Sequence, residues 1–279
     1  MHAIGFMQGR LSPRINGRIQ AFPAAYWEAE FPQAERLGLS LVEWTLDQEG
    51  LHANPLLTEN GREQIGRLSR KHGIRVQSVT GDCFMQAPFH KAQGADHERL
   101  LDDLRAIIRA CGAAGVRFLV FPLVDAGRIE NAQQAEALHE GLAAVEPLLR
   151  ELRVMMLFES DFAPRALAAF IAGYPGDVFG INYDIGNSAS LGHDPREEIR
   201  ACGARITNVH VKDRIRGGTT VPLGEGDADF DTVFAELARA RYAGDFILQT
   251  ARATDEAHAA ALAKYRDMVR DWIRREFAS

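Results

Sequence analysis

Two patterns of apolar and polar positions alternate along the whole chain. Short apolar runs rich in Val, Ile, Leu and Phe alternate with longer segments in which apolar residues recur every three or four positions. Leu138, Leu142, Val145 and Leu149 show the helical spacing. The run VMMLF at 154–158 is continuously apolar, as expected for a strand with both faces buried. The pattern therefore predicts strands and helices in strict alternation.

The alternation amounts to eight strand–helix units. We expect strands at 3–7, 40–44, 74–80, 116–122, 154–159, 178–184, 206–211 and 246–249. We expect helices at 24–37, 59–72, 96–114, 132–152, after Pro164, after Pro195, at 231–241 and at 254–276. Eight such units predict an α/β fold, a (β/α)₈ TIM barrel forming a single domain over residues 1–279. An open doubly wound sheet is the alternative, but the first turn lacks a GxGxxG fingerprint.

Composition narrows the classes of protein to which the chain can belong. The 279 residues carry a formal net charge of −6, with 38 Asp and Glu against 32 Lys and Arg. This balance argues against a nucleic-acid partner held by phosphate contacts. No apolar run is long enough to span a bilayer, and the first residues lack a signal-peptide pattern. Cys83, Cys111 and Cys202 have no CxxC spacing and are typical of buried thiols in a reducing compartment. We expect a soluble cytoplasmic protein without a membrane partner.

Four successive strands end in side chains that can bind a metal ion. Strands five to eight end in Glu159, Asp184, His210 and Gln249. In a barrel these ends lie at one rim, where the active sites of this fold are found. Three oxygen donors and one imidazole suit a divalent ion such as Mn²⁺, Mg²⁺, Co²⁺ or Zn²⁺, and the absence of thiolates disfavours a purely structural zinc site. Each residue alone could instead cap a helix or balance charge, but four in succession favour a single metal site.

The same strand ends carry a resemblance to a known family. The segments LFES (157–160), NYDIGN (182–187), NVHVKD (208–213) and VPLGEGDADF (221–230) resemble the sugar-phosphate isomerase/epimerase family with the xylose-isomerase-like barrel. Within it, the chain is most similar to L-ribulose- and L-xylulose-5-phosphate 3-epimerases and to hexulose-6-phosphate isomerases. The likeness is strongest between residues 159 and 249. It implies a metal-dependent isomerase or epimerase of a small sugar or sugar phosphate, working through an enediolate.

The resemblance also assigns roles, with one departure. In the family a Glu, an Asp, a His and a second Glu bind one divalent ion, and the two glutamates form the acid/base pair. These positions correspond to Glu159, Asp184, His210 and Gln249, so a neutral amide stands where a second catalytic carboxylate is expected. Gln can offer its carbonyl oxygen to a metal but cannot act as a base near neutral pH. With Glu159 as the acid/base, same-face transfer, and hence aldose–ketose isomerisation, is favoured. Epimerisation stays open if Lys212, His193 or a metal-bound water supplies the second proton.

Polar residues beyond the strand ends are candidates for substrate binding. They lie in the loops that follow strands one, six, seven and eight, where barrels commonly hold phosphate. The candidates are Asn187, His193, Lys212, Arg216, Arg10 and Arg252. Solvated loop positions are the alternative interpretation for His193 and Arg10. Asp213 is predicted to orient His210 or Lys212.

Three other functions remain to be weighed against the isomerase or epimerase. A barrel lyase or dehydratase acting on a keto-polyol would use the same metal and enolate chemistry. An endonuclease for abasic DNA is disfavoured by the acidic charge and by the lack of further His ligands after strands two to four. A sugar-binding barrel without catalysis would follow if Gln249 had removed the activity. The family also makes a homo-oligomer possible, although no interface can be recognised in one chain.

Overall fold

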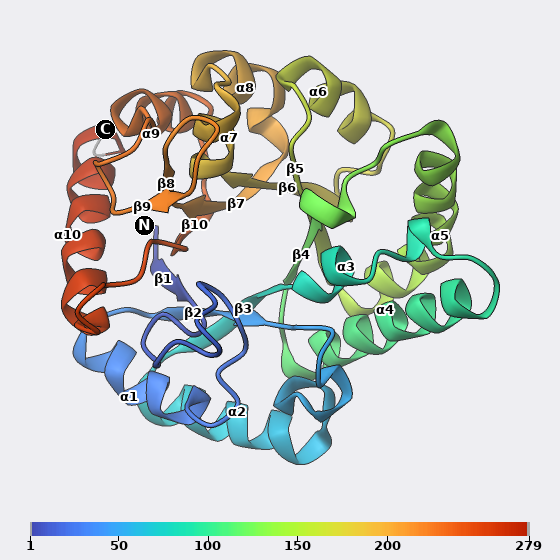
Figure 1. Ribbon diagram of the computed structural model, residues 1–279, viewed down its shortest axis with the longest axis horizontal. Helices are drawn as coiled ribbons and strands as arrows, with labels where there is room; N and C mark the ends of the chain where they lie inside the picture. The colour runs from blue at the N-terminus through green and yellow to red at the C-terminus, as the bar shows by residue number, and fades with distance from the viewer. Residues whose placement is uncertain (1, 278–279) are drawn as a thin grey trace.

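Eight parallel strands close into a barrel in the computed structural model, which describes residues 2–277 (Figure 1). Going round the barrel, the order is β1, β10, β7, β6, β5, β4, β3 and β2. The predicted (β/α)₈ TIM barrel is thus confirmed, and all eight predicted strands are present. Their bounds are β1 Ile4–Met7, β2 Leu41–Thr45, β3 Arg75–Thr80, β4 Phe118–Leu123, β5 Met155–Ser160, β6 Phe179–Asp184, β7 Ile206–Val211 and β10 Asp245–Leu248.

Helices surround the barrel and connect successive strands (Figure 1). The main ones are α1 Trp27–Arg36, α2 Glu59–His72, α4 Gly94–Ala114, α5 Ala132–Leu152, α6 Pro164–Ala172, α8 Pro195–Cys202, α9 Phe230–Arg239 and α10 His258–Glu276. The expected start of the last helix at residue 254 was wrong, because residues 251–257 extend the loop after β10. The short elements that were not predicted include α3 Asp82–Gln86, α7 Ile185–Leu191 and the strands β8 Asp213–Arg214 and β9 Thr220–Val221.

Side-chain caps explain several helix starts. The Asp194 side chain accepts a hydrogen bond from the Arg196 amide, and Pro195 follows it at the first helical position of α8. Asn131 caps α5 in the same way through the Gln134 amide. Such side chains pair backbone N–H groups that a helix start leaves without partners, and a cap contributes about 1 kcal/mol. Local sequence therefore sets where these helices begin.

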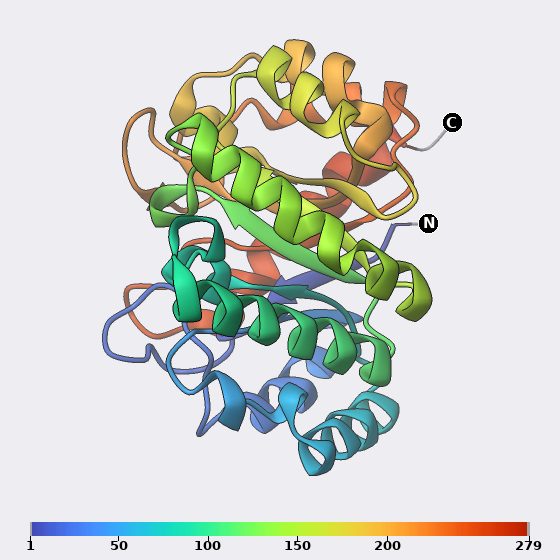
Figure 2. The same ribbon diagram turned by 90° about the vertical axis from the view of Figure 1, so that its right-hand side faces the viewer.

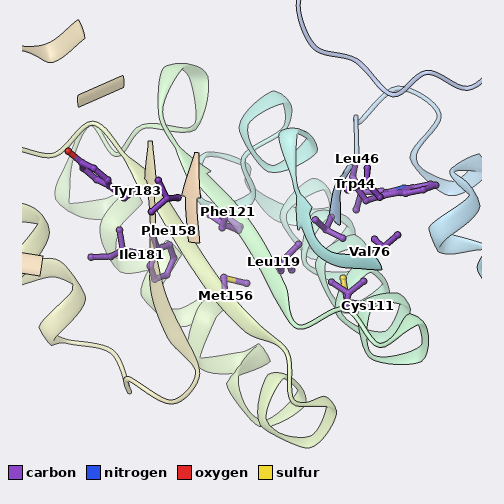
Figure 3. Close-up of a cluster of buried hydrophobic side chains, with 14 of the residues drawn as sticks. Trp44, Leu46, Val76, Cys111, Leu119, Phe121, Met156, Phe158, Ile181 and Tyr183 are labelled. Carbon is purple, nitrogen blue, oxygen red and sulfur yellow. The ribbon is translucent and has the colours of Figure 1, made fainter. Parts of the chain in front are cut away.

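The main hydrophobic core fills the layer between the outer face of the barrel and its helices. Figure 3 shows part of it, including Trp44 of β2, Phe121 of β4 and Phe158 of β5. All three aromatic side chains have 0% exposure. Phe158 stacks on Phe179 with ring centroids 5.8 Å apart and contacts Phe121 edge-on. Since every strand buries its outward face here, the predicted apolar runs are accounted for by this layer.

The interior of the barrel is different, because a polar layer lies above a small apolar floor. Met7, Leu41 and Ile247 form the floor. Two register shifts align the polar residues above it. A shift between Ile181 and Asn182 pairs Asp184 with His210, and a shift between Val42 and Glu43 pairs Glu43 with Ser78. A one-residue shift changes which side chains face inward together, so these irregularities determine which polar groups meet.

Long loops gather at the carboxyl end of the barrel. Figure 2 shows the blue loop of residues 8–26 and the orange hairpin of β8 and β9 at the left of the molecule, with the N-terminus on the right. Among residues 2–277, no helix combines the length and apolar character that crossing a membrane requires. The loops therefore surround the rim at which the predicted site residues emerge.

Candidate functional site

Three of the predicted ligands meet at the carboxyl end of the barrel. Glu159 of β5, Asp184 of β6 and His210 of β7 each offer one ligand atom, and these atoms lie within 4.8 Å of one another. The three residues are buried, with exposures of 7%, 4% and 0%. We call this group the ligand triad. Two carboxylate oxygens and one imidazole nitrogen so close together form a set that suits a divalent cation.

The imidazole of His210 is held by a carboxylate beneath it. His210 Nε2 lies 2.6 Å from Glu43 Oε1, so this nitrogen donates to Glu43 and Nδ1 faces the triad. Glu43 is itself fixed by Ser78 Oγ at 2.7 Å and Asn208 Nδ2 at 3.0 Å. A carboxylate on the far nitrogen orients a metal-binding histidine and makes it a better ligand. Glu43 thus has the role that the sequence had assigned to Asp213.

Asp213 has a different task. Its oxygens accept hydrogen bonds from the backbone amides of Gly224, Gly226 and Ala228. A Cβ on Gly226 would lie 2.2 Å from Asp213 Oδ1, so only glycine fits there. The prediction that Asp213 orients His210 or Lys212 was therefore wrong. Its carboxylate instead holds the loop between β9 and α9.

The two carboxylate oxygens of Asp184 have different partners, one in helix α7 and one in the site. Oδ1 accepts from the Asn187 amide and caps α7. Oδ2 is buried and accepts no hydrogen bond of regular geometry from residues 2–277, although Lys212 Nζ lies 2.5 Å away as an ion pair. Lys212 can approach because Gly186 has no side chain; a Cβ there would be 2.8 Å from Lys212 Cγ. Oδ2 of Asp184 is thus paired with a cation, the ammonium of Lys212.

Amides hold both oxygens of Glu159. Asn182 Nδ2 donates to Oε2 and Asn187 Nδ2 donates to Oε1, each at 2.8 Å. Arg214 Nη1 in turn donates to Asn187 Oδ1 at 2.9 Å. The carboxylate is therefore fixed in one orientation by two neutral amides, and its Oε2 also lies 3.1 Å from Nδ1 of His210. Such support from neighbouring side chains keeps Glu159 in place for binding a cation or taking a proton.

Gln249 follows β10 and completes the rim beside the triad. Its Oε1 accepts from Lys212 Nζ at 3.0 Å, and its Nε2 donates to Gln20 Oε1 at 3.0 Å. These two bonds orient the amide, because Nε2 must donate to Gln20 and Oε1 must accept from the ammonium. Lys212 thus joins Gln249 to Asp184. The fourth predicted ligand therefore lies next to the triad with its oxygen on the side of Lys212.

Charges within the site shift the pKa values of its members in different directions. Burial alone would lower the pKa of His210, but Glu43 and Glu159 outweigh burial and raise it to about 10. Burial favours the neutral form of Glu159, yet His210 and Lys212 hold its pKa below the usual value. Burial and the charge of Glu159 raise the pKa of Asp184, against the opposing effect of Lys212. Without another cation, the carboxylates of Glu159 and Asp184 are thus paired with His210 and Lys212.

The residues fit a divalent metal ion. The Asp184 oxygen that faces Lys212, the anchored Glu159 carboxylate and the inward Nδ1 of His210 are donors of the appropriate kinds. The two carboxylates carry a formal charge of −2, which balances a divalent ion. A cation binding at Asp184 Oδ2 would have to compete with Lys212, whose other partner is Gln249. Glu159, Asp184 and His210 would hold the ion, with the Gln249 oxygen beside them.

Of the predicted substrate contacts, Asn187 and Lys212 contact members of the site, and the other four bond elsewhere. His193 Nδ1 lies 3.2 Å from Glu198, in a separate cavity of about 300 Å³ behind α7. Arg216 is exposed and lines the same cavity. Arg214, which the sequence did not single out, is the cation that reaches Asn187.

The two remaining arginines hold the loop of residues 8–26. Arg252 donates to the carbonyl oxygens of Gly9 and Ser12. Arg10 is buried and donates to the carbonyls of Ile19 and Thr250. Its Nη2 also lies 3.4 Å from Gln20 Oε1. The guanidinium of Arg10 thus reaches the site only through Gln20, and that of Arg252 is used by backbone carbonyls.

Several site residues were missed in the sequence, and some of them left a signal. Asn182 and Asn208 each precede a ligand by two positions, so they face the same way as Asp184 and His210. Glu43 is a charged residue in a strand whose residues are all buried, and a buried charge requires a partner in the interior. Gln20 left no signal, because it lies in an irregular loop far along the chain from its partners.

Comparisons with known proteins agree with this geometry. The family model described as xylose isomerase-like TIM barrel matches residues 31–275. The L-ribulose-5-phosphate 3-epimerase UlaE of Salmonella paratyphi C is 28% identical over 271 residues, covering 93% of each chain. The protein of the same name from Escherichia coli strain SMS-3-5 is 27% identical over 262 residues, covering 90% of this chain and 92% of the relative.

Solved structures have the same fold. An L-ribulose 3-epimerase superposes with a TM-score of 0.75 at 17% identity, covering 99% of this chain and 96% of the other. The IOLI protein, described with a bound zinc atom, has a TM-score of 0.77 at 14% identity, and each chain is covered completely. At such identities the likeness establishes the fold alone, whereas the family model covers most of the chain. The protein is therefore an enzyme that belongs to the xylose isomerase-like TIM-barrel family.

Proposed function

We propose that the protein is a metal-dependent epimerase acting on a small ketose or its phosphate. The observation that carries this is the ligand triad, in which Glu159, Asp184 and His210 bring one ligand atom each to within 4.8 Å of the others. Two relatives are named for the 3-epimerisation of L-ribulose 5-phosphate. A pentulose 5-phosphate is the substrate class that these names support for this chain.

Reversal of a carbon next to a ketone begins with the removal of its proton. A divalent ion at the triad would polarise the ketone oxygen and stabilise the negative charge of the enediolate. Glu159 is the carboxylate suited to take the proton, because it belongs to the triad at which the ketone oxygen would be bound. Asn182 and Asn187 keep it in place during the transfer. Glu43 keeps the imidazole of His210 aimed at the triad.

Cations at the rim support an anionic substrate end. Arg214 is half-buried and reaches the site through Asn187, and its other contacts are with the carbonyl of Gly218. Guanidinium groups form paired hydrogen bonds with phosphate oxygens, which makes Arg214 the preferred anchor. The hairpin of β8 and β9 supplies it, in the loop that follows the seventh barrel strand. Arg214 replaces Arg216 as the proposed phosphate contact.

Aldose–ketose isomerisation is the second candidate, and Gln249 favours it. The amide has no proton-transfer capacity, and both of its polar atoms are engaged by Lys212 and Gln20. If Glu159 were the sole group to move protons, the proton would return on the same face and to the neighbouring carbon. That outcome converts a ketose into an aldose without inverting a centre. The products of the two reactions differ, so one spectrum separates them.

The test is to follow L-ribulose 5-phosphate and L-ribulose by NMR with protein treated with a chelator and then supplied with Mn²⁺ or Zn²⁺. We expect the 3-epimer to form only after a metal is added. Formation of an aldose would favour the second candidate. An ultraviolet-absorbing dehydration product would instead indicate a lyase. No conversion of either sugar with any metal would contradict the proposal.

A further inference from the structure

The replacement of a second glutamate by Gln249 leaves the proposed epimerisation short of one proton-transfer group. Inverting a carbon requires a proton to leave on one side and another to arrive on the opposite side. Glu159 accounts for one of these transfers, and the amide of Gln249 for neither. The inference below concerns the missing group and rests on the proposed function. A second buried acid at the rim would supply the other transfer.

Asp82 is such an acid, and it lies at the carboxyl end of β3. It is the first residue of α3 and is only 9% exposed. Its Oδ2 accepts a hydrogen bond from Gln20 Nε2 at 2.7 Å. Gln20 Oε1 in turn accepts from Gln249 Nε2 at 3.0 Å. One glutamine therefore connects Asp82 directly with the position at which the second carboxylate is missing.

No counter-charge is paired with Asp82. Within residues 2–277 its hydrogen-bond partner is the neutral amide of Gln20, and no lysine or arginine forms an ion pair with it. Arg10 acts on it from a greater distance, while Asp47 and Glu159 add negative charge. A buried carboxyl that served only structure would be expected to have a cation or several backbone N–H donors. Asp213 and Glu30 have such donors, and Asp82 does not.

The surroundings of Asp82 keep its proton available near neutral pH. Burial raises the pKa of Asp82 to about 7, with smaller contributions from Asp47 and Glu159 in the same direction. The bond from Gln20 and the charge of Arg10 act in the opposite direction. A general acid works best when its pKa lies near the working pH. Geometry connects Asp82 to the site through Gln20 and Gln249, because Gln249 accepts from Lys212 and Lys212 pairs with Asp184.

We propose that Asp82 is the second proton-transfer group and exchanges a proton with the substrate carbon on the side away from Glu159. In the forward direction Glu159 takes the proton of the C–H bond beside the ketone, and the bonding pair becomes part of the enediolate. The O–H of Asp82 then gives its proton to the same carbon, and a new C–H bond forms. Asp82 is left ionised and Glu159 protonated. Exchange with solvent restores both, and in the reverse direction the roles are interchanged.

The experiment compares wild type, Asp82→Asn and Asp103→Asn in D₂O with L-ribulose 5-phosphate as the probe. Asp103 is the matched control, a buried acid of α4 that pairs with His52 and Arg99. NMR reports two quantities: formation of the 3-epimer, and exchange of the C3 hydrogen of the remaining substrate for deuterium. An Asn at position 82 keeps an acceptor for Gln20, and thermal unfolding checks that the variant is folded.

We expect Asp82→Asn to lower epimer formation by about 10²- to 10⁴-fold, the usual contribution of one acid or base. Exchange at C3 should stay within about 10-fold of wild type, because Glu159 still removes and returns the proton on its own side. Asp103→Asn should match wild type in both. Epimer formation by Asp82→Asn at the wild-type rate, or equal loss of epimer and exchange, would overturn the inference alone. A wild type that gives neither epimer nor exchange would overturn the proposed function and this inference with it.

Discussion

The two sides of the rim differ in what their acidic residues do. The arc formed by β5, β6 and β7 carries Glu159, Asp184 and His210, whose free atoms converge on one point. The arc formed by β1, β2 and β3 carries Glu43 and Asp82, together with Gln20 from the loop of residues 8–26. The first arc supplies the proposed metal ligands. The second arc orients His210 through Glu43 and contacts Gln249 through Gln20. A site of this kind therefore needs both arcs, although only one contains the recognisable motifs.

The electrostatics of the two arcs differ in the same way. The pKa of Glu159 is held below its usual value, chiefly because His210 and Lys212 outweigh burial. On the other arc burial dominates and raises the pKa of both Glu30 and Asp82 to about 7. Glu159 thus stays charged, although burial raises the pKa of its neighbour Asp184, whereas Asp82 and Glu30 are partly protonated at neutral pH. This asymmetry is what an acid and a base in one site require.

The largest effect should come from Glu159, the proposed base of the first arc. Glu159→Gln keeps the size and an oxygen donor but removes the proton-accepting charge. We expect kcat for a converted ketose to fall about 10³-fold, within the usual range for one general base. Steady-state kinetics at saturating metal measures this. Glu236→Gln on α9, a carboxylate paired with Arg200 and Arg239, serves as the control. A fall in kcat of less than about 10-fold would mean that the proton is removed by a residue of the other arc.

The next effect concerns stability and tests the electrostatics of the second arc. Glu30 accepts from the amides of Gly9 and Leu11, and burial raises its pKa from 4.5 to about 7. A folded-state pKa above the unfolded one stabilises at low pH, and this contribution disappears as pH rises through 7. Between pH 5 and pH 8 wild type should lose about 2 to 3 kcal/mol of unfolding free energy relative to Glu30→Gln.

Urea unfolding at the two pH values measures this difference. Glu28→Gln is the control, because Glu28 lies exposed on the same helix. Its unfolding free energy should follow the pH dependence of wild type. A Glu30→Gln variant with the same pH dependence as wild type would show that Glu30 is ionised in the folded protein throughout this range. The electrostatic contrast between the arcs would then rest on Asp82 alone.

A smaller effect should connect the two arcs. Glu43→Gln weakens the bond that orients His210, since a neutral amide replaces the carboxylate at 2.6 Å. We expect metal affinity to fall about 10- to 100-fold, as is typical when such an outer partner is removed. Titration with Mn²⁺ or Zn²⁺ measures it. Glu198→Gln, a buried carboxylate that contacts Tyr183, Ser188 and His193, should leave the affinity unchanged. Equal affinities of wild type and Glu43→Gln would mean that the arcs act independently.

The first arc could be predicted from sequence because it is built from strand ends. Apolar periodicity locates the strands, parallel strands of a barrel end at one rim, and Glu159, Asp184 and His210 then have to be neighbours. The same argument placed Gln249 beside them. The start of α8 followed in the same way from Pro195. These features depend on short-range patterns, which one sequence contains.

The second arc could not be predicted, because its contacts depend on register and on an irregular loop. Glu43 meets His210 across 167 positions of sequence, and a register shift between β2 and β3 sets which neighbours it has. Gln20 reaches Asp82 and Gln249 only through the path of the loop of residues 8–26. Arg216 was the candidate in this loop and Arg214 was not considered, because the register of β8 with β9 decides which arginine reaches Asn187. Loop geometry and bulges are set by the whole fold, so residue type alone does not reveal them.

The most direct test of the account is the metal content of the purified protein, measured by elemental mass spectrometry for wild type beside His210→Ala and Glu198→Gln. After incubation with Mn²⁺, Co²⁺ or Zn²⁺ and dialysis, we expect about one divalent ion per chain in wild type and in Glu198→Gln, and a large loss in His210→Ala, because the triad supplies the ligands. Wild type that retains no metal, or His210→Ala that retains as much as wild type, would contradict the assignment of the triad as a metal site.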